Sequence, residues 1–347
     1  MALRVDKYAL STQTYGVPLI APMKKYTRAS GYPQDPAAPG VILMVGHGAG
    51  FFKEMWEPII EDLFKFDDAK HSTPLIREVW GLDCQNHGEA CTLNEDILAK
   101  NPEILTIWDY AEAFAALYKS GLLGVLDPKK HRVVLCGHSA GAVGITLSTS
   151  FFNPPSRVPY HKLILVDPPI WSKKFHGQDS DVYKMVEEMT PVRRDIWKSR
   201  DEAKTWLRKR LPWNSWDERV FEKYVEHGIR SLPTAFYPDK TGATLTTHRI
   251  AENVAFTGKL YSYDALDRLN QICAHVPVHL VYGENNDMFE RELQDSLINP
   301  EDGRSFASVR RIEDAGHLVP QEAPTNLAKA IMDILLTPEG ERPLSKL

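Results

Sequence analysis

Short apolar runs alternate with longer amphipathic stretches along most of the chain. The runs at 41–48, 77–83, 132–137, 162–167, 276–283 and 308–313 predict strands. Apolar runs without period-two alternation indicate strands that are buried on both faces. The stretches 51–66 and 107–121 predict helices, with Pro58 as an unusual residue in the first. This alternation predicts an α/β fold with a mostly parallel sheet flanked by helices, and residues 8–30 predict antiparallel strands at one edge.

Residues 170–250 break this rhythm. They contain no convincing strand, and most of the segment has a helical pattern. Five of the eight tryptophans lie here: Trp171, Trp197, Trp206, Trp213 and Trp216. We therefore expect a helical cap over a cleft, inserted after the strand that ends at Asp167 into a core of residues 1–169 and 251–347. The alternative is a helical subdomain that only packs against the sheet.

A serine lies where one predicted strand meets a helix. The sequence there reads Gly137-His138-Ser139-Ala140-Gly141, which matches G-x-S-x-G in the strand–turn–helix context that the motif requires. Glycines allow a sharp turn without clashes of side-chain carbon atoms, and the turn lifts the hydroxyl above the sheet. We interpret Ser139 as a nucleophile; the alternative is an ordinary glycine-rich turn.

A serine nucleophile needs a base, and the base needs an acid to orient it. His317 lies in "DAGHLVP", just past the last predicted strand, where a loop can bring its ring over the same sheet edge. Asp167 ends the strand after the serine strand, and Asp287 follows the next strand. Either carboxylate could orient His317, and the Asp-Pro-Pro turn favours Asp167. Otherwise both aspartates are turn residues that cap local N–H groups.

The oxyanion of an acyl-transfer reaction needs backbone donors. We expect them to be the N–H groups of Ala140 and of Ala49, in the loop "GHGAGF" after the first parallel strand. A dinucleotide-binding loop is excluded, because Phe51 stands where the third glycine of G-x-G-x-x-G would have to be. In "DCQNHGEA", at the same edge, we interpret His87 as a structural loop histidine, with a functional role as the alternative.

Composition and charge narrow the classes of protein. Hydrophobic residues make up 43% and charged residues 25%, as in an ordinary globular protein, and the net charge of −5 does not indicate nucleic-acid binding. No apolar run is long enough for a transmembrane helix, and no signal-peptide core is evident. The four cysteines, Cys84, Cys91, Cys136 and Cys273, lack metal or disulfide spacing. We therefore expect a reducing compartment, no metal and no cofactor.

The last three residues are Ser345, Lys346 and Leu347. At a carboxyl terminus this tripeptide is read by the peroxisomal import receptor. The expectation is a location in the peroxisome matrix, with that receptor as a partner.

These motifs together resemble the α/β-hydrolase superfamily over about residues 40–330. "GHGAGFFKEMW", "DCQNHGEA", "CGHSAG", "LILVDPP" and "DAGHLVP" are similar to the fungal peroxisomal branch, with its lipase, toxin-biosynthesis and acyl-CoA hydrolase members. The resemblance implies a peroxisomal serine hydrolase without a cofactor. It also supports Asp167 over Asp287, because members of that branch place the acid after this strand.

The substrate expectation is a small-molecule acyl thioester, with an acyl-CoA favoured. The first alternative is a lipase or carboxylesterase. The second, which the sequence favours least, is a non-catalytic binding protein on the same fold. Residues 193–210 carry eight basic residues against three acidic ones, so this window could attract the phosphates of coenzyme A. The candidate substrate-binding residues are Trp197, Trp206, Arg208 and Arg210. The alternative is a solvated helix face.

Overall fold

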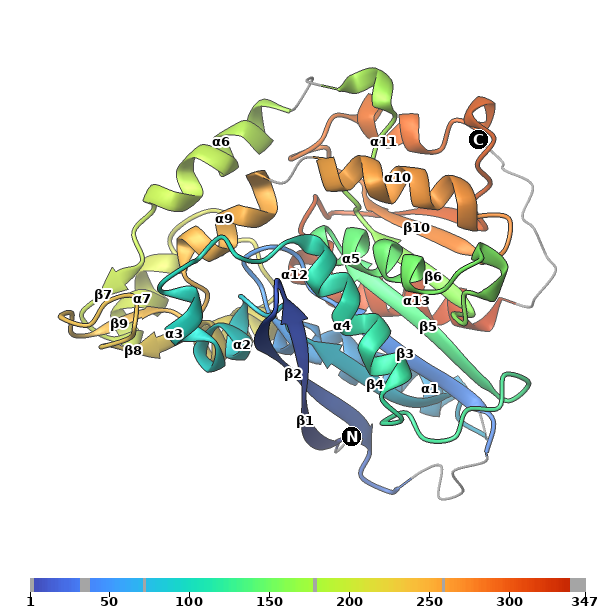
Figure 1. Ribbon diagram of the computed structural model, residues 1–347, viewed down its shortest axis with the longest axis horizontal. Helices are drawn as coiled ribbons and strands as arrows, with labels where there is room; N and C mark the ends of the chain where they lie inside the picture. The colour runs from blue at the N-terminus through green and yellow to red at the C-terminus, as the bar shows by residue number, and fades with distance from the viewer. Residues whose placement is uncertain (1–2, 32–37, 71–72, 177–179, 258–259, 338–347) are drawn as a thin grey trace.

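A single large sheet organises the molecule. The computed structural model describes residues 3–31, 38–70, 73–176, 180–257 and 260–337. Eight strands pair in the order β1-β2-β4-β3-β5-β6-β10-β11, and every pairing from β4 to β11 is parallel (Figure 1). The parallel strands are β3 (Gly40–Gly46), β4 (Ile76–Leu82), β5 (His131–His138), β6 (Lys162–Val166), β10 (Val278–Gly283) and β11 (Ser308–Ile312). They match the six predicted runs to within a few residues.

An antiparallel hairpin covers one edge of the sheet. Strands β1 (Leu3–Thr14) and β2 (Val17–Arg28) pair along their whole length, and β2 pairs antiparallel with β4. The turn between them consists of Tyr15 and Gly16, both with positive φ (47° and 79°). A two-residue turn of this kind matches the twist of the strands that it joins. The expected edge strands within residues 8–30 are therefore present.

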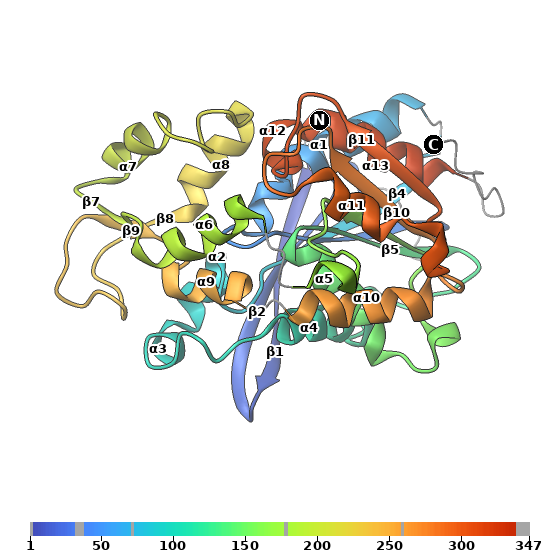
Figure 2. The ribbon, with the colours of Figure 1, turned by 90° about the horizontal axis from the view of Figure 1, so that it is seen from above.

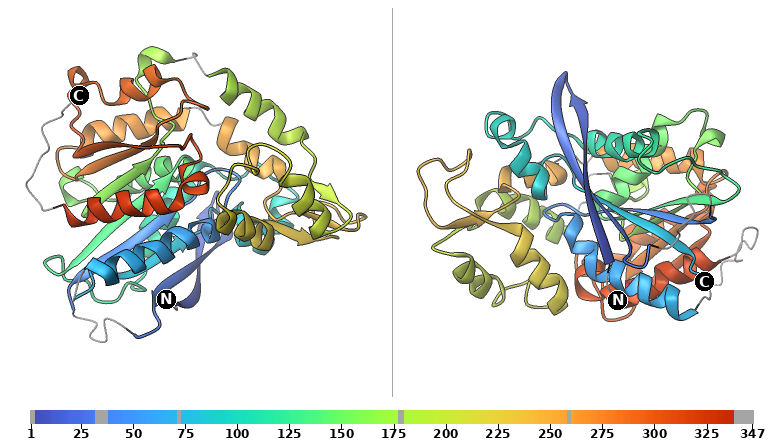
Figure 3. Two further views of the ribbon diagram at one scale, coloured as in Figure 1. Left: turned by 180° about the vertical axis from the view of Figure 1, so that it is seen from behind. Right: turned by 90° about the horizontal axis from the view of Figure 1, so that it is seen from below.

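Helices cover both faces of the sheet. Helices α4 (Ile107–Lys119), α5 (Ala140–Ser148) and α10 (Leu260–Ile272) lie on one face, and α1 (Glu57–Lys70) and α13 (Pro324–Leu336) lie side by side on the other (Figure 3). Helix α1 begins six residues later than position 51, after a 3₁₀ turn at Lys53–Trp56. Pro58 thus lies in the first turn, where its missing N–H costs no helical hydrogen bond.

The central strands are buried on both faces, as their apolar runs predict. In β3, Ile42 and Met44 pack toward the side of Phe114 in α4. Leu43 and Val45 pack on the opposite side, with α1 and α13. Each fully buried aliphatic side chain contributes about 1.5–3 kcal/mol to folding. A double-sided core therefore holds the carboxyl ends of the parallel strands in a fixed relation, and the candidate site lies there.

Most of the segment between β6 and α10 forms a separate lobe beside this edge (Figure 2). It contains α6 (Asp181–Met189), α7 (Arg200–Leu207), α8 (Glu218–Gly228) and α9 (Arg249–Thr257). It also contains a small sheet in the order β7-β9-β8, at Ile196–Trp197, Ala243–Leu245 and Ile229–Ser231. The expectation that residues 170–250 hold no strand is therefore wrong. Strands of two or three residues are too short to leave a periodic signal.

The lobe has a hydrophobic core of its own, which includes two of its tryptophans. Trp197 and Trp216 are 2% and 4% exposed and pack with Phe221 of α8. The same cluster includes Phe52 and Met55, which belong to the loop and 3₁₀ turn after β3. Apolar packing therefore joins the lobe to the loop on which Ala49 lies.

The remaining helices are short and lie in connections. They are α2 (Gly88–Leu93), α3 (Glu95–Leu98), α11 (Arg291–Leu297) and α12 (Val319–Glu322), with 3₁₀ turns at Thr149–Phe151, Pro155–Arg157, Lys173–Phe175, Thr190–Val192 and Pro300–Asp302. Within the described residues, no helix combines the length and the apolarity needed to cross a bilayer.

Candidate active site

Ser139 lies on a strained turn between β5 and α5. Its backbone has φ of 51° and ψ of −120°, which a residue with a side chain rarely adopts and which costs about 1–3 kcal/mol. The flanking glycines permit the turn. A methyl group on Gly137 would lie 2.4 Å from the Gly141 carbonyl oxygen, and one on Gly141 would lie 2.5 Å from the Gly46 oxygen. Such a turn is maintained only when the surroundings enforce it, and it presents the hydroxyl at the sheet edge.

His317 connects this serine to a carboxylate. Its Nε2 lies 3.1 Å from the Ser139 Oγ, and its Nδ1 lies 3.0 Å from an oxygen of Asp167. A carboxylate can only accept, so Nδ1 carries the ring proton and Nε2 is free to accept the serine hydroxyl. Both His317 and Asp167 are about 95% or more buried. The arrangement can therefore move a proton from Ser139 to His317 while Asp167 holds the ring.

Asp167 is itself fixed by the backbone around it. It follows β6 directly, has a positive φ of 42°, and donates its N–H to the Val281 oxygen. Its second carboxylate oxygen accepts the N–H of Gly283 at 2.8 Å. One oxygen is thus held by the end of β10, and the other faces the imidazole.

Asp287, the alternative acid, contacts the main chain of His317 and not the ring. Its carboxylate accepts the His317 N–H at 2.7 Å. On the other side, His138 Nε2 donates to the His317 carbonyl oxygen at 2.8 Å. The structure therefore separates the two aspartates: Asp167 holds the ring, and Asp287 and His138 hold the backbone that carries it.

The loop after β3 lies against the serine turn. A methyl group on Gly48 would be 3.2 Å from the Ser139 Cβ and 2.9 Å from the His138 ring. His47 holds this loop in place through two hydrogen bonds. Its backbone N–H donates to the Tyr110 hydroxyl, and its ring Nε2 accepts the backbone N–H of Cys84 at 3.0 Å. Burial lowers the pKa of His47 to about 4, so the ring stays neutral and Nε2 can accept. Ala49 and Ala140 then flank the same space beside Ser139.

A buried ion cluster supports the two loops at this edge. The Lys53 ammonium lies 2.7 Å from Asp83 and 2.8 Å from Glu89, and the backbone N–H of Lys53 donates to Asp83 at 2.8 Å. Burial alone would lower the pKa of Lys53, but the charges of Asp83 and Glu54 outweigh it and raise that pKa. The cluster joins the segment after Ala49 to the loop after β4.

Residues 42–330 match the Alpha/beta hydrolase family. The chain belongs to this family. It is 28% identical over 252 residues to the type I acyl-CoA thioesterase mpaH of Penicillium brevicompactum. The matched region covers 67% of this chain and 53% of that protein. The chain thus spans about half the length of the curated relatives that it matches.

Solved structures show the same fold. The peroxisomal alpha-beta-hydrolase Lpx1 of Saccharomyces cerevisiae has a TM-score of 0.74 and 17% identity, covering 99% of this chain and 93% of that one. E-2-(Acetamidomethylene)succinate hydrolase has a TM-score of 0.65 and 14% identity, covering 94% of this chain and 98% of the other. The fold class and the resemblance stated from the sequence are confirmed.

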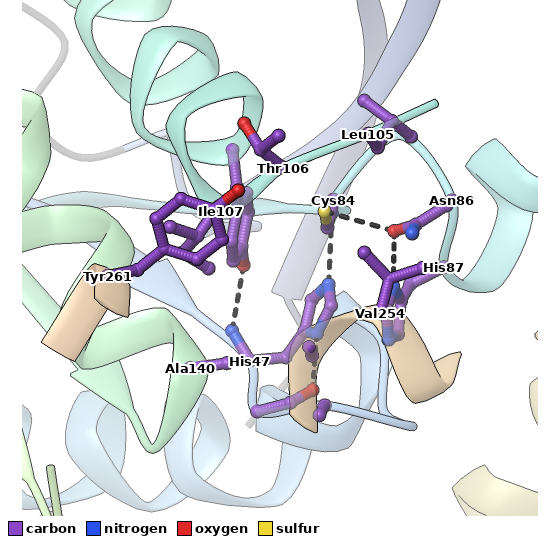
Figure 4. Close-up of a pocket in the computed structure, with 14 residues that line it drawn as sticks. His47, Cys84, Asn86, His87, Leu105, Thr106, Ile107, Ala140, Val254 and Tyr261 are labelled. Atoms are coloured by element: carbon purple, nitrogen blue, oxygen red, sulfur yellow. Dashed lines mark hydrogen bonds between the residues drawn. The ribbon is translucent and has the colours of Figure 1, made fainter. Parts of the chain in front are cut away.

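In this α/β-hydrolase, two hollows meet at the serine turn. The hollow that contains Ser139 has a volume of about 480 Å³, part of it open to solvent, and its walls include Val143, Tyr183, Phe256 and Phe289. The second hollow has a volume of about 400 Å³, part of it likewise open to solvent, and extends past His47 toward the loop after β4 (Figure 4). The two share Ala49, Ile107, Ala140, Ala255 and Tyr261. The site therefore has a largely apolar chamber at the serine and a second chamber on the other side of Ala49 and Ala140.

The candidate substrate-binding residues lie elsewhere. Among the residues that the structure describes, Trp197, Trp206, Arg208 and Arg210 line neither hollow at Ser139. Trp197 is part of the lobe core, Arg208 pairs with Glu218, and Arg210 lies 4.0 Å over the Trp206 ring.

The four candidate residues of this basic window therefore do not line the space at Ser139. Acidic side chains outside the window offset part of its positive charge, because Lys204 pairs with Glu222 of α8 at 2.5 Å. Within the window, Arg194 pairs with Glu202 at 2.8 Å. A count of charges along the sequence cannot include partners that folding brings from another helix.

Sequence reasoning missed the contacts by which His138 and Asp287 hold the backbone of His317. His138 is the variable second residue of the G-x-S-x-G motif, and no sequence signal marks it as a donor to the His317 loop. His87 was interpreted as a structural loop histidine, yet it lines the second hollow.

The tripeptide Ser345, Lys346 and Leu347 lies outside the described residues.

Proposed function

We propose that this chain is a serine hydrolase that cleaves acyl thioesters or esters through Ser139, His317 and Asp167. The observation that carries the proposal is the continuous path of two hydrogen bonds, 3.1 Å and 3.0 Å long, from the serine hydroxyl to the buried carboxylate. It begins on a strained turn at the head of α5, where N–H groups and the helix dipole favour negative charge.

Acylation uses His317 first as a base and then as an acid. The Ser139 oxygen forms a bond to the substrate carbonyl carbon while its proton passes to His317 Nε2. The carbonyl oxygen becomes an oxyanion, which the N–H groups of Ala49 and Ala140 stabilise. When the intermediate collapses, the bond to the leaving sulfur or oxygen breaks. The leaving group takes the proton from His317, and an acyl-serine remains.

Deacylation repeats these steps with water. His317 removes a proton from water, the hydroxide forms a bond to the acyl carbon, and the same donors hold the oxyanion. Collapse breaks the bond to Ser139, whose oxygen takes back the proton from His317, and the carboxylic acid leaves. Asp167 stays ionised and stabilises the imidazolium in both halves. The cycle needs only water as a co-reactant.

Two observations favour different leaving groups. Similarity to an acyl-CoA thioesterase over 67% of this chain supports a CoA thioester. In the described part of the chain, however, neither hollow is lined by a lysine or arginine, which supports an uncharged ester as the second candidate. We keep the CoA thioester as the first candidate, because a pantetheine arm alone could enter while its phosphates stay in solvent.

The lobe is proposed as the lid of the cleft, with residues 170–250 as its approximate extent. Tyr183 of α6 and Phe256 of α9 both line the chamber at Ser139. The Tyr183 hydroxyl donates to the Phe256 oxygen at 3.0 Å, so the two helices are tied together over the cleft. Helix α9, which begins at Arg249, belongs to this lid by its contacts although the expected boundary divides it.

The proposed location is the peroxisome matrix. It rests on the tripeptide Ser345-Lys346-Leu347, which the import receptor reads at a free carboxyl end. A fold neighbour described as peroxisomal supports the same location. A fluorescent protein fused ahead of residues 1–347 should enter peroxisomes, and the same fusion ending at residue 344 should stay in the cytosol. Equal import of both fusions would contradict the proposal.

The function is tested with a substrate panel. Matched acyl-CoA thioesters, p-nitrophenyl esters and triglycerides are offered to the wild type and to Ser139→Ala. We expect hydrolysis of at least one class by the wild type and loss of it in the variant. A fluorophosphonate probe should label the wild type at Ser139. An inert serine together with no turnover on any class would favour a binding protein on the same fold.

A further inference from the structure

His87 lines the second hollow, and one nitrogen of its ring has no hydrogen-bond partner among the described residues. The residue is 3% exposed, and the nitrogen concerned is Nε2. In Figure 4, His87 and Asn86 lie at the opposite end of the hollow from Tyr261 and Ala140. A buried polar atom without a partner costs about 1–3 kcal/mol. A substrate group that donates a hydrogen bond to this nitrogen would remove this cost.

The hydrogen bonds of Asn86 determine what His87 can offer. The Asn86 side-chain nitrogen donates to the Ala251 oxygen at 3.0 Å, and its oxygen accepts the Cys84 thiol at 3.2 Å. The same oxygen lies 2.6 Å from His87 Nδ1 and so accepts the proton of that nitrogen. His87 Nε2 is therefore an acceptor. Burial holds the pKa of His87 well below its usual value, with His47 and Arg193 adding to the effect, which keeps the ring neutral.

An unpartnered nitrogen is not by itself a site, as His279 shows. His279 is also 3% exposed, with Nδ1 paired to the Ser308 hydroxyl at 2.8 Å and Nε2 without a partner in the described part of the chain. It lies within β10 and lines neither hollow at Ser139. His87 differs because its ring borders a space that is continuous with the serine chamber through Ala49 and Ala140.

We infer that the second hollow binds the acyl arm of the substrate and that His87 Nε2 accepts a hydrogen bond from a hydroxyl group on that arm. The inference rests on the proposed acyl-transfer function. The walls along the way, Leu105, Ile107 and Val254, suit an apolar chain. The two amide groups of a pantetheine arm would need buried hydrogen-bond partners along these walls, whereas an alkyl chain would not, so we assign this hollow to the acyl arm.

The same lining selects a hydroxyl among possible donors. An ammonium group would need a carboxylate, and the described lining of this hollow contains none. An amide group would bring a carbonyl that needs its own donor, yet the Asn86 nitrogen is already used by Ala251. A hydroxyl can donate to His87 Nε2 without leaving a second buried group that requires a partner.

The test compares ω-hydroxyacyl p-nitrophenyl esters with unsubstituted acyl esters of equal length, over a series of lengths. At the best length, the wild type should prefer the hydroxyacyl ester by about tenfold in kcat/KM. His87→Asn keeps a donor at the Nδ1 position and removes the acceptor, so the preference should fall to about one. His87→Gln places an oxygen at the Nε2 position, and it should retain a preference.

The control is His279→Asn, which makes the same change at a histidine whose Nε2 is likewise unpartnered and should leave the preference unchanged. Thermal unfolding of each variant checks that it is folded. A wild-type preference of about one, or a preference that survives in His87→Asn, would overturn the inference. A preference that follows a hydroxyl on the leaving alcohol instead would overturn the assignment to the acyl arm. Absence of hydrolysis of every ester and thioester would instead contradict the proposed function.

Discussion

The ring of His138 donates a hydrogen bond to the backbone of His317: its Nε2 lies 2.8 Å from the His317 carbonyl oxygen. His138 immediately precedes the proposed nucleophile, so one turn carries both Ser139 and a clamp on the base that serves it. Burial holds the pKa of His138 well below its usual value, with the neighbouring His317 adding to the effect. The ring is therefore neutral, with its proton on the nitrogen that faces the carbonyl.

Removing this clamp should slow the chemical step. His138→Phe leaves the His317 carbonyl without its donor, and an unsatisfied buried group of this kind costs about 1–3 kcal/mol. We expect kcat to fall about tenfold or more with little change in KM. His138→Gln can place an N–H at the Nε2 position and should recover most of the loss. An equal loss in both variants would show that the ring matters for packing alone.

Ser139→Ala and His317→Ala should each abolish most turnover. Groups that act as one unit lose nearly the whole effect when either is removed, so we expect kcat to fall by about 10⁴-fold or more in each. The double variant should be hardly worse than either single one. Steady-state kinetics with the preferred substrate measures this, and circular dichroism checks that the fold is kept. Additive losses in the double variant would argue against a shared proton transfer.

The two aspartates should behave differently. Asp167→Asn removes the acceptor that fixes the His317 tautomer, and in such a site kcat falls by about 10⁴-fold. Asp287→Asn keeps an oxygen that can still accept the His317 N–H, so the loss should be about tenfold or less. Measuring kcat for the two variants distinguishes which aspartate acts on the His317 ring. If the Asp287 variant is the inactive one, the assignment of the acid is wrong.

The ion cluster around Lys53, next to the loop after β3, should be costly to break. Lys53→Met leaves the buried Asp83 without its cation, and loss of one member of a buried pair costs about 3–5 kcal/mol. Urea unfolding at neutral pH measures the change in the free energy of unfolding. The control is Lys65→Met, which removes a half-exposed partner of Asp62 and should cost under about 1 kcal/mol. Similar costs for the two variants would contradict the structure.

Stability should fall in mild acid partly through His47. Burial lowers the pKa of its folded form from 6.5 to about 4, so the unfolded chain binds the proton more readily. The contribution of His47 is therefore complete above about pH 6.5 and is lost as the pH falls toward 4. A shift of this size corresponds to roughly 3 kcal/mol.

The variant that isolates this effect is His47→Gln. Its side-chain oxygen can accept the Cys84 N–H in place of Nε2, and it does not titrate. Free energies of unfolding measured from pH 7 to pH 4.5 should decline less steeply in His47→Gln than in the wild type. Parallel declines would place the acid sensitivity elsewhere, at other buried histidines such as His87 or His138.

Several features of this protein follow from the sequence alone. The parallel strands, the flanking helices and the edge hairpin are visible because apolar periodicity is a local property of the chain. The nucleophile turn is visible because a close approach such as that of Gly137 to the Gly141 oxygen admits only glycine, and this requirement leaves a motif. The chain order of Ser139 and His317 follows from where each lies relative to a strand.

Tertiary structure decided the rest, because it depends on groups far apart in the chain. Asp167 and Asp287 are both polar residues after strands, and only the folded loop shows that one meets the His317 ring and the other its N–H. The basic window looked like a ligand site until folding paired Lys204 with Glu222 of another helix. His87 looked like an ordinary loop histidine, and its unpartnered nitrogen became evident only when Asn86 and the hollow were in place. Periodicity and motifs record what a residue needs from its neighbours in sequence, whereas hydrogen-bond partners and cavities exist only once distant segments meet.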